Sequence, residues 1–486
     1  MARSIERPIV AWLSLLLCGT FTVQPLHAQV ADAALGDEAV ATLKKAAAHY
    51  RNKVASHGGY VYYYSADLTQ RWGEGKVSAD TIFVQPPSTP SVGMAYLDAF
   101  DATGDIFYLD AARETADALV YGQLQSGGWT QVIHFAAPER GRLGRYRKGT
   151  GGKWNNSSLD DGQTQAALQF LIEADEALQF KDVEIHESVM YGLDALLKAQ
   201  FPNGAFPQVW SGAVQAKPVR KAQFPSYDWK TEGRGADYWD FYTLNDGLAG
   251  SVSDVLILAD RVYGDEKYAT ALAKLGDFLI LAQMPDPQPG WCQQYNYDML
   301  PTWARKFEPP AITAWESQDV IETLIKIARH TGDKKYLAPI PAALEYFTKR
   351  CLLPDGQVAR YYELRTNKPL YMDAAYQLTY DDSATPSHYG WKQPAHFEEL
   401  ARAYIAVKEG KLIESTQPIV ALEDDVRRII GELDQQGRWV TLYAGERLVG
   451  QPKFARGFQY ISSDVFNRNV HALSEFIRRL RISPQP

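Results

Sequence analysis

A corner motif that recurs along the chain limits the folds available to it more than any other feature. Gly104-Asp105, Gly264-Asp265 and Gly332-Asp333 are each followed by a tyrosine three residues after the aspartate, and Lys181-Asp182 is a degenerate fourth copy. The four aspartates lie 77, 83 and 68 residues apart. Because apolar residues with helical spacing precede and follow each corner, every copy predicts a hairpin of two antiparallel helices.

A glycine-aromatic turn recurs after the second helix of each predicted hairpin, in phase with the corners. Its copies are Gly128-Trp129-Thr130-Gln131, Gly204-Ala205-Phe206-Pro207-Gln208 and Gly290-Trp291-Cys292-Gln293, with Gly356-Gln357-Val358 as a weaker fourth. Helix pairs that repeat at such a period bury their faces against neighbouring pairs, and a ring of them makes an α/α toroid. We therefore predict an all-α fold, an α/α toroid of repeated helical hairpins whose long loops carry function.

The two ends of the chain depart from this repeat. Residues 1–28 combine a basic start, a short apolar run and a small final residue, which is typical of a secretory signal peptide and too short for a membrane span. After residue 415 the pattern changes to a helix, an alternating strand segment and a closing helix. We expect a signal peptide at 1–28, a toroid domain at 29–415, a small C-terminal elaboration packed on the toroid at 416–486, and a secreted or periplasmic location.

Charge and composition narrow the range of partners. The 486-residue chain carries a formal net charge of −8, which argues against a nucleic-acid partner. Its 12 tryptophans exceed the needs of packing, and surplus aromatic residues in an exported protein often form sugar-stacking surfaces, although any single ring more often belongs to the core. We expect a monomer with no membrane partner. Only Cys292 and Cys351 follow the predicted signal peptide, and the sequence leaves open whether they pair.

Pairs of polar residues open three of the predicted inner helices at one phase of the repeat: Asp160-Asp161, Asn245-Asp246 and Glu316-Ser317. Helix N-capping accounts for one such residue per helix and remains an alternative for each of them. It does not account for two in a row. Because the inner helices of a toroid run in the same direction, these ends are expected to surround one mouth of the bowl.

A lone arginine, Arg305, lies between Trp303 and Phe307 in a segment interrupted by prolines. The segment contains too much proline for a helix and too many aromatic residues for a flexible linker. One interpretation is a structural ion pair with Glu308 or Glu316. The other is that a rigid loop holds Arg305 in place for chemistry.

Five motifs in order give the chain a resemblance to polysaccharide lyase family 10, the pectate lyases built on an α/α toroid. They are Leu159-Asp160-Asp161-Gly162-Gln163-Thr164, the glycine-aromatic turns, Tyr242-Thr243-Leu244-Asn245-Asp246, the block from Trp291 through Ala304-Arg305-Lys306-Phe307-Glu308-Pro309-Pro310 to Glu316-Ser317, and Ala359-Arg360-Tyr361-Tyr362-Glu363 continuing to Thr366-Asn367-Lys368-Pro369.

The resemblance implies β-elimination on a polyuronate, most simply pectate, with Ca²⁺ as the cofactor. A base removes the C5 proton next to the carboxylate, the C4 oxygen leaves, and cations offset the negative charge that develops. By position, Arg305 corresponds to the family's base, Asp160 to an active-centre aspartate, Asp246 to an acid near the Ca²⁺, and Arg360 to a substrate arginine. The predicted site comprises catalytic Arg305 and Asp160, metal ligands Asp246 and Asp161, and substrate-binding Arg360, Lys368, Asn245, Gln294 and Trp291.

Basic residues elsewhere leave the subsites open. Residues 140–153 hold six arginines and lysines just before Asp160, and a solvated loop is the ordinary interpretation of such a run, with substrate clamping as the alternative. Ala374 stands where the family usually has a further arginine, so galacturonate itself is not fixed as the substrate.

Two other functions compete with a lyase. A glycoside hydrolase on the same kind of toroid would use two of Asp160, Asp161, Asp246 and Glu316 as an acid and base pair. A glycan-binding protein would keep the aromatic surfaces without the chemistry. The identity of the uronate, endo or exo action and the compartment are open at this stage.

Overall fold

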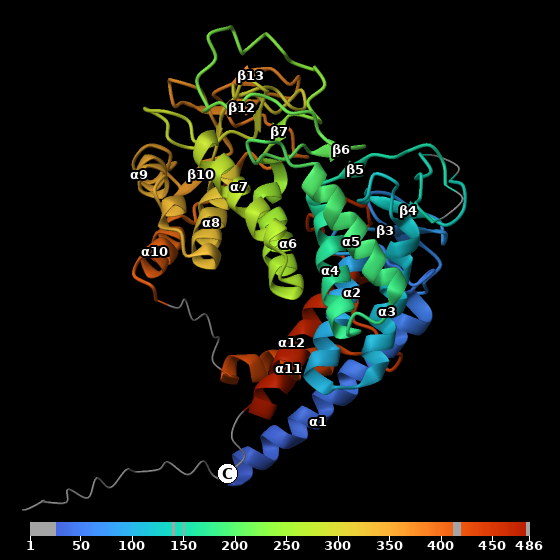
Figure 1. The fold of residues 1–486 in the computed structure, drawn as a ribbon. Coiled ribbons are helices and arrows are strands. Elements are labelled where there is room, and N and C mark those ends of the chain that lie inside the picture. Colours follow the sequence, from blue (N-terminus) through green and yellow to red (C-terminus); the bar gives the residue numbers. More distant parts are fainter. Residues whose placement is uncertain (1–25, 139–140, 149–150, 412–418, 483–486) are drawn as a thin grey trace, which may run out of the picture.

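A computed structural model describes residues 26–138, 141–148, 151–411 and 419–482 (Figure 1). The predicted signal peptide lies almost wholly outside these residues. Helices α1 to α12 span Leu26–His49, Thr89–Thr103, Ile106–Gly122, Gln163–Ala177, Val183–Lys198, Leu248–Tyr263, Glu266–Ala282, Ala314–Thr331, Ile340–Arg350, Phe397–Lys408, Ile419–Glu432 and Ser463–Ile482. Short 3-10 segments, η2 (Asp160–Gly162), η3 (Asn245–Gly247) and η4 (Lys334–Leu337), and a π segment, η1 (Tyr50–Val54), complete the helical part.

Each predicted corner joins two helices as expected. Gly104, Gly264 and Gly332 end α2, α6 and α8 in the left-handed conformation, and the aspartate that follows each of them accepts a hydrogen bond from the backbone of the next helical segment. In the degenerate copy, Asp182 caps α5 in the same way. A left-handed glycine followed by a capping aspartate is a compact way to reverse a helix, which is why the motif was readable in the sequence.

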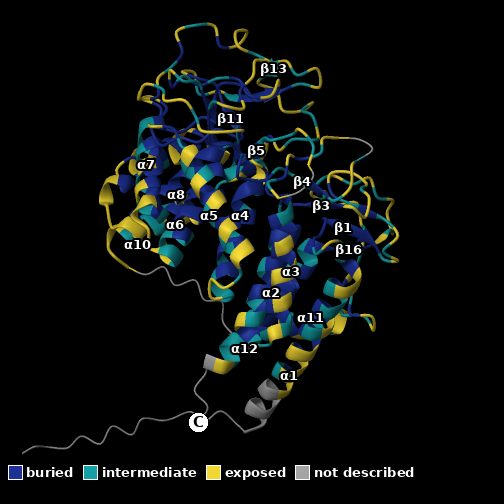
Figure 2. Cartoon of the chain, turned by 45° about the vertical axis from the view of Figure 1, so that its right-hand side comes forward, coloured by how far each residue is buried: buried dark blue, intermediate teal, exposed yellow. Residues whose placement is uncertain are grey.

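The helices form two curved layers. Helices α12, α2, α4, α6, α8 and α10 pack side by side in that order, and α3, α5 and α7 each pack on the helix that precedes them (Figure 1). The exposed faces of these helices lie on the outside of the molecule, as the burial pattern in Figure 2 shows. Helix α10 packs against α8 and α9, and within the described ranges it makes no extensive contact with α11 or α12. The hairpin repeat is confirmed, whereas a closed toroid stays a prediction.

The last part of the chain joins the first. Helix α12 packs along α2 and α1, and α11 packs on α12 and α1. Strand β16 (Gln459–Ser462) pairs with β1 (Tyr63–Ser65) and with β15 (Val440–Leu442). The C-terminal segment therefore continues the array of helices beside the N-terminal ones, and the division into a toroid domain and an elaboration stays a prediction.

Many of the small antiparallel sheets and long loops gather at the top of Figure 1. The remaining strands are β2 (Arg71–Trp72), β3 (Thr81–Phe83), β4 (Val132–His134), β5 (Ser157–Ser158), β6 (Val209–Trp210), β7 (Tyr242–Thr243), β8 (Gln294–Tyr295), β9 (Ile312–Thr313), β10 (Gln357–Ala359), β11 (Tyr361–Tyr362), β12 (Pro369–Met372), β13 (Leu378–Thr379) and β14 (Lys392–Pro394). Their pairs include β5 with β6, β7 with β8 and β9 with β11. Strands β7, β12 and β13 are labelled at the top of Figure 1, whereas β3 and β4 lie lower on the right-hand side.

The recurring turns anchor these loops to the helices by the same contact. The indoles of Trp129 and Trp291 are fully buried, and each donates a hydrogen bond of 2.8 Å to a carbonyl of the preceding helix, Leu119 and Leu279 respectively. These two turns are therefore fixed to their hairpins in the same way.

Gly204 is the residue of the second turn on which close packing depends. Its φ is +94°, and a Cβ placed there would lie 1.8 Å from the carbonyl oxygen of Lys274 in α7. We expect Gly204→Ala to lower the free energy of unfolding by about 3 kcal/mol or more, because it adds a backbone clash to a strained φ. Denaturant unfolding measures this. Gly264→Ala is the matched control, since its φ is +64° with no atom within 4 Å of the added Cβ, and a loss of only about 1 kcal/mol is expected. Equal losses would contradict the packing argument.

Candidate active site

Two short turns of the same shape bring the acidic residues together. Asp161 in η2 and Asp246 in η3 both have left-handed backbones, with φ of 46° and 53°, and each is followed by a glycine with positive φ. The turns η2 and η3 pack against each other at the starts of α4 and α6. The aspartate side chains make no capping hydrogen bond to either helix. The capping interpretation therefore does not account for Asp160, Asp161 and Asp246 in the described part of the chain.

These three residues form what we term the carboxylate cluster. One oxygen of each of Asp160, Asp161 and Asp246 lies within 4.8 Å of the others. Partial desolvation and the charges of Asp160 and Glu74 raise the pKa of Asp161 to about 6. Burial and the charges of Asp161 and Asp160 raise the pKa of Asp246 to about 8. Burial likewise raises the pKa of Asp160. Three carboxylates this close destabilise one another unless a proton or a cation is shared between them.

Glutamine and asparagine side chains hold the cluster in place. Gln208, from the second recurring turn, donates a 2.6 Å hydrogen bond to Asp160, and Gln85 donates one of 3.0 Å to Asp161. Gln293, from the third turn, donates to the Oδ1 of Asn245, whose amide donates to Asp246 at 2.5 Å. The recurring turns thus hold the acids in fixed positions. The sequence showed Gln208 and Gln293 as part of the repeat but did not indicate that they support the carboxylates, and it gave no signal for Gln85.

Arg305 lies beside the cluster in an ion pair with Glu308. Its Nε and Nη2 donate to the two carboxylate oxygens of Glu308 at 2.8 and 2.5 Å, and its backbone N–H donates to the same group. Glu308 is buried, with 1% of its side chain exposed, whereas 44% of the Arg305 side chain is exposed. Burial lowers the pKa of Arg305, but the hydrogen bond and charge of Glu308 outweigh it and raise that pKa further above its usual value.

A second arginine is held more deeply. Arg360 is buried and lies 3.3 Å from the carboxylate of Glu316, on the first turn of α8. Its guanidinium lies over the ring of Tyr389, 4.3 Å from the centroid, and the hydroxyl of Tyr389 donates to Glu308. The positive charge of Arg360 lowers the pKa of Asp246, although burial and the other aspartates prevail. Tyr389 thus joins the two ion pairs, a role that the sequence did not reveal.

The cluster opens into a cavity of about 340 Å³. Its lining is polar apart from Trp154 and Val209, and consists of Glu74, Thr130, Gln131, Trp154, Asn156, Ser158, Asp160, Asp161, Gln163, Val209 and Arg305. The cavity therefore presents acidic groups together with one guanidinium, and Trp154 provides an aromatic surface.

Several predicted substrate-binding residues lie elsewhere. Trp291 is fully buried under its turn, and Gln294 is 1% exposed with its amide donating to the carbonyl of Tyr238. Neither side chain lines the cavity, and both are buried in the loops beneath the site, so their assignment to substrate contact stays a prediction that their burial does not support. Asn245 is 4% exposed and positions Asp246. Lys368 is exposed and lies over the ring of Tyr380, and no described contact links it to the cluster.

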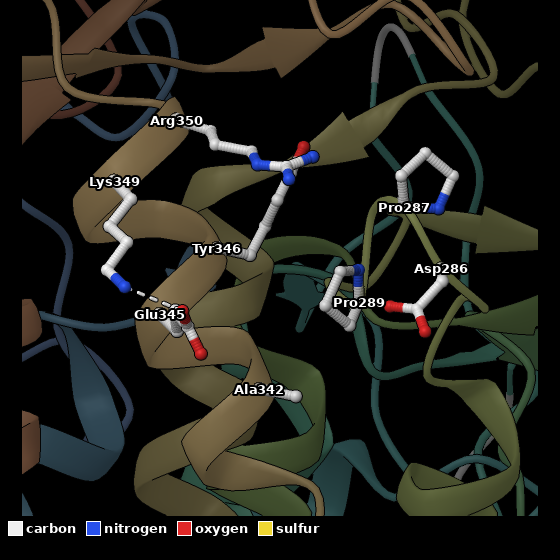
Figure 3. A pocket seen from close by; sticks show the side chains of 8 residues that line it. All are labelled: Asp286, Pro287, Pro289, Ala342, Glu345, Tyr346, Lys349 and Arg350. Carbon is white, nitrogen blue, oxygen red and sulfur yellow. Dashed lines mark hydrogen bonds and ion pairs between the residues drawn. The ribbon is translucent and has the colours of Figure 1, made fainter.

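A second cavity, of about 380 Å³, lies away from the cluster between α9 and the loop at residues 286–289 (Figure 3). Prolines line one side, and the Glu345–Lys349 ion pair and Arg350 line the other. It contains no group of carboxylates comparable to the cluster among the residues described there. Cys292 and Cys351, whose pairing the sequence left open, are both free and buried.

The carboxylate cluster fits a hard cation. Carboxylate and carbonyl oxygens are the donors that Ca²⁺ takes, and the cluster offers three carboxylates whose mutual repulsion a divalent ion would relieve. The donor set contains no thiolate or imidazole of the kind that Zn²⁺ prefers. Within the described residues the geometry is consistent with a metal site, and Ca²⁺ as the particular ion is a proposal.

Comparison with known protein families connects this geometry with a reaction class. Residues 139–354 match the family model described as pectic acid lyase. The resemblance seen in the sequence is confirmed over this segment, which contains the cluster, Arg305 and Glu308. No curated protein matches the chain.

Solved structures give weaker likenesses. A mutant of the family 10 polysaccharide lyase from Cellvibrio cellulosa, in complex with trigalacturonic acid, is 19% identical with a TM-score of 0.46 and covers 66% of this chain and 98% of its own. A cellobiose 2-epimerase from Bacillus thermoamylovorans B4167 is 14% identical with a TM-score of 0.45 and covers 92% of this chain and 100% of its own. TM-scores below 0.5 support no conclusion about activity.

The raised pKa of Asp246 predicts how the cluster affects stability. A carboxylate whose pKa is raised to about 8 by folding contributes stability at low pH that is lost as the pH rises toward 8. We expect Asp246→Asn, in a chelator at pH 9, to raise Tm by at least about 2 °C over the wild type, because it removes a repelled charge. Addition of Ca²⁺ should raise the wild-type Tm and change that of the variant much less.

Asp237→Asn is the control for this experiment, because Asp237 is an exposed carboxylate outside the cluster. It should leave both Tm and the response to Ca²⁺ unchanged. A lower Tm for Asp246→Asn at pH 9 would show that the Asp246 carboxylate is not under repulsion.

Proposed function

We propose that the protein is an exported polysaccharide lyase that cleaves a polyuronate, most simply polygalacturonate, by β-elimination. The observation that carries the proposal is the juxtaposition of the carboxylate cluster with Arg305, which lines one cavity together with Asp160 and Asp161, inside the segment that matches the pectic acid lyase family. An acidic substrate can approach such a cluster only if cations screen it, and arginine together with a divalent ion supplies that screening. In the described part of the chain no helix is both long and apolar enough to cross a bilayer.

Asp160, Asp161 and Asp246 would hold the metal ion, and Ca²⁺ bound there would supply positive charge to the carboxylate of the uronate. Gln208, Gln85 and the Asn245 amide keep these three carboxylates oriented. Because the supporting groups are hydrogen-bonded before any substrate arrives, little reorganisation is needed during the reaction.

Arg305 is the residue we assign to the reacting centre. It borders the cavity with 44% of its side chain exposed, and Glu308 fixes its orientation through two hydrogen bonds. To act as the base, Arg305 would have to be in its neutral form, which can accept the C5 proton of the substrate. Glu308 opposes that neutral form because it raises the pKa of the guanidinium. An alkaline optimum is therefore the expected signature of this role. Arg360, buried beside Glu316, acts on the cluster through its charge.

A hydrolase fits the cluster less well. Retaining hydrolases place their two carboxyl groups about 5–5.5 Å apart, and inverting enzymes place them further apart to admit water. The three aspartates offer oxygens within 4.8 Å of one another, and the Arg305–Glu308 and Arg360–Glu316 ion pairs lie nearby. This arrangement favours a shared cation over an acid and base pair.

Incubation with polygalacturonate tests the reaction class. We expect a Ca²⁺-dependent rise in ultraviolet absorbance from an unsaturated sugar end, which excess chelator abolishes. Reducing ends without that absorbance would identify a hydrolase, and binding without either product would identify a glycan-binding protein. The same assay on a panel of other polyuronates identifies which polymer is cleaved, so that a wrong substrate is not mistaken for a wrong reaction class.

Arg305→Ala and Arg305→Lys test the assignment of the arginine. Both are expected to lower kcat by at least about 100-fold, because a positioned catalytic group contributes roughly that much, while the affinity for oligouronate stays close to the wild type. Arg305→Ala should also lower Tm, because it leaves the buried Glu308 carboxylate without its ion-pair partner, whereas Arg305→Lys keeps a positive charge there and should lower Tm less. Lys306→Ala is the matched control, since Lys306 is the neighbouring exposed cation and lies over Tyr376. Turnover within a few fold of the wild type in Arg305→Ala would show that Arg305 serves only the fold.

Glu308→Gln tests whether Arg305 acts as the base. Removing the Glu308 charge lowers the pKa of Arg305, so the rising limb of the kcat profile should move to lower pH. The amide keeps one hydrogen-bond acceptor for the guanidinium. If Arg305 contributes only positive charge, the limb should stay where it is and only the amplitude should fall.

A further inference from the structure

The described part of the basic loop, residues 141–148 and 151–153, contains cations with different partners. Arg147 lies 2.8 Å from Glu187 and Lys148 lies 3.1 Å from the same carboxylate, which belongs to the outer helix α5. These two cations tie the loop to the body of the protein. They follow the ordinary interpretation of a charged loop, so their charge is already balanced.

Arg142 has a different environment. Its guanidinium carbon lies 3.9 Å from the ring centroid of Trp154, and it forms no ion pair with any described acidic group. Trp154 is half-buried and lines the same cavity as Asp160, Asp161 and Arg305. Backbone hydrogen bonds fix the pair, since the carbonyl of Trp154 accepts from Arg145 at 2.6 Å and its N–H donates to Leu143 at 3.3 Å.

We propose that Arg142 and Trp154 form a carboxylate-binding subsite for a uronosyl residue next to the carboxylate cluster. The inference rests on the proposed function, because it names how the same cavity accepts an acidic sugar. The ring of Trp154 provides the flat apolar surface on which a sugar face packs. Arg142 provides the charge that recognises the carboxylate of that sugar.

The availability of hydrogen-bond donors distinguishes Arg142 from the other arginines of the site. Arg305 donates two of its groups to Glu308, and Arg360 is buried beside Glu316. A guanidinium stacked on an aromatic ring uses its face, so its in-plane N–H groups remain free to bind a carboxylate with two hydrogen bonds. Lysine cannot reproduce that geometry.

The charge of the cavity explains why such a residue is needed. Glu74, Asp160 and Asp161 line it together, and a metal ion balances only part of that negative charge. A uronate carboxylate that enters on the Trp154 side meets these acids. Arg142 offsets their repulsion there, and it favours a free carboxylate over a methyl ester at this position.

Steady-state kinetics with polygalacturonate and Ca²⁺ test the subsite. Arg142→Ala is expected to raise KM about tenfold, which is the scale of a lost charged hydrogen bond, and to change kcat less than about twofold. Arg142→Lys should recover only part of the loss. Arg145→Ala is the matched control, because Arg145 is an exposed arginine of the same loop with no described side-chain contact to the cavity, and its KM should equal that of the wild type. An unchanged KM in Arg142→Ala would overturn the proposal.

Esterified substrate separates the roles of the two residues. On highly methyl-esterified pectin, Arg142→Ala should lose much less relative to the wild type than on polygalacturonate, whereas Trp154→Ala should raise KM on both. If Trp154→Ala lowers Tm, Trp154→Phe keeps a ring and provides the comparison. Equal losses of Arg142→Ala on both substrates would show that it holds the loop instead of a carboxylate.

The outcomes also separate this inference from the proposed function. If the wild type cleaves none of the polyuronates, the proposed function fails, and no KM is defined for any variant. Isothermal titration of trigalacturonate then decides the subsite alone. Binding that weakens in Arg142→Ala and not in Arg145→Ala supports it, and equal or absent binding overturns it. If the wild type cleaves polygalacturonate and Arg142→Ala behaves identically, only the subsite fails.

Discussion

Repulsion among three carboxylates is the interaction for which the neighbouring groups of the site compensate. Asp160, Asp161 and Asp246 place oxygens within 4.8 Å of one another, with Asp160 and Asp246 partly buried and Asp161 exposed. Desolvation raises their pKa values, and repulsion from the neighbouring aspartates adds to it for Asp161 and Asp246. Without compensating contacts such a group would move into water or protonate. The neighbouring glutamines prevent movement, and the two arginine ion pairs supply nearby positive charge. A divalent cation bound by these three carboxylates would relieve the repulsion.

The repeated helical hairpin allows the fold to remain stable with this crowded arrangement of charges. Each recurring turn is fixed by a buried aromatic residue and presents a glutamine at the same level, so one structural device positions both Gln208 and Gln293. The turns η2 and η3 repeat a left-handed aspartate followed by glycine. The stability of the helical array, which comes from its large apolar core, offsets the unfavourable backbone conformations and the crowded charges. The carboxylate cluster therefore occupies the loop end of the helices, while the opposite end holds the compact Gly-Asp corners.

The Arg305–Glu308 pair places conflicting demands on one side chain. Glu308 orients the guanidinium. The same contact stabilises the charged form of Arg305, which must lose a proton before Arg305 can act as a base. Of the two roles considered for Arg305 from the sequence, the structure combines features of both, since the residue is anchored by a buried acid and still borders the cavity. The local sequence could not separate them, because Glu308 lies only three residues away and serves equally well in a structural pair or in a catalytic one. What distinguishes a catalytic arginine is exposure toward a cavity, which depends on the neighbouring loops.

The sequence by itself determined the helical hairpins, their corners and the recurring turns, because each depends on local chemistry: a left-handed glycine, a capping aspartate, or apolar residues at helical spacing. The shared phase of the polar pairs within the repeat also predicted that the acidic residues lie near one another. The sequence also named the three aspartates and the two arginines. Only the tertiary structure decided that Trp291 and Gln294 are buried, that Gln85, Gln208 and Tyr389 support the site, and that α12 packs on α2. It likewise divided the basic loop, pairing Arg147 with α5 and leaving Arg142 over Trp154. Whether a side chain is buried depends on residues that are distant in the sequence. The same is true of the partner with which a charged side chain pairs, so no local pattern encodes either property.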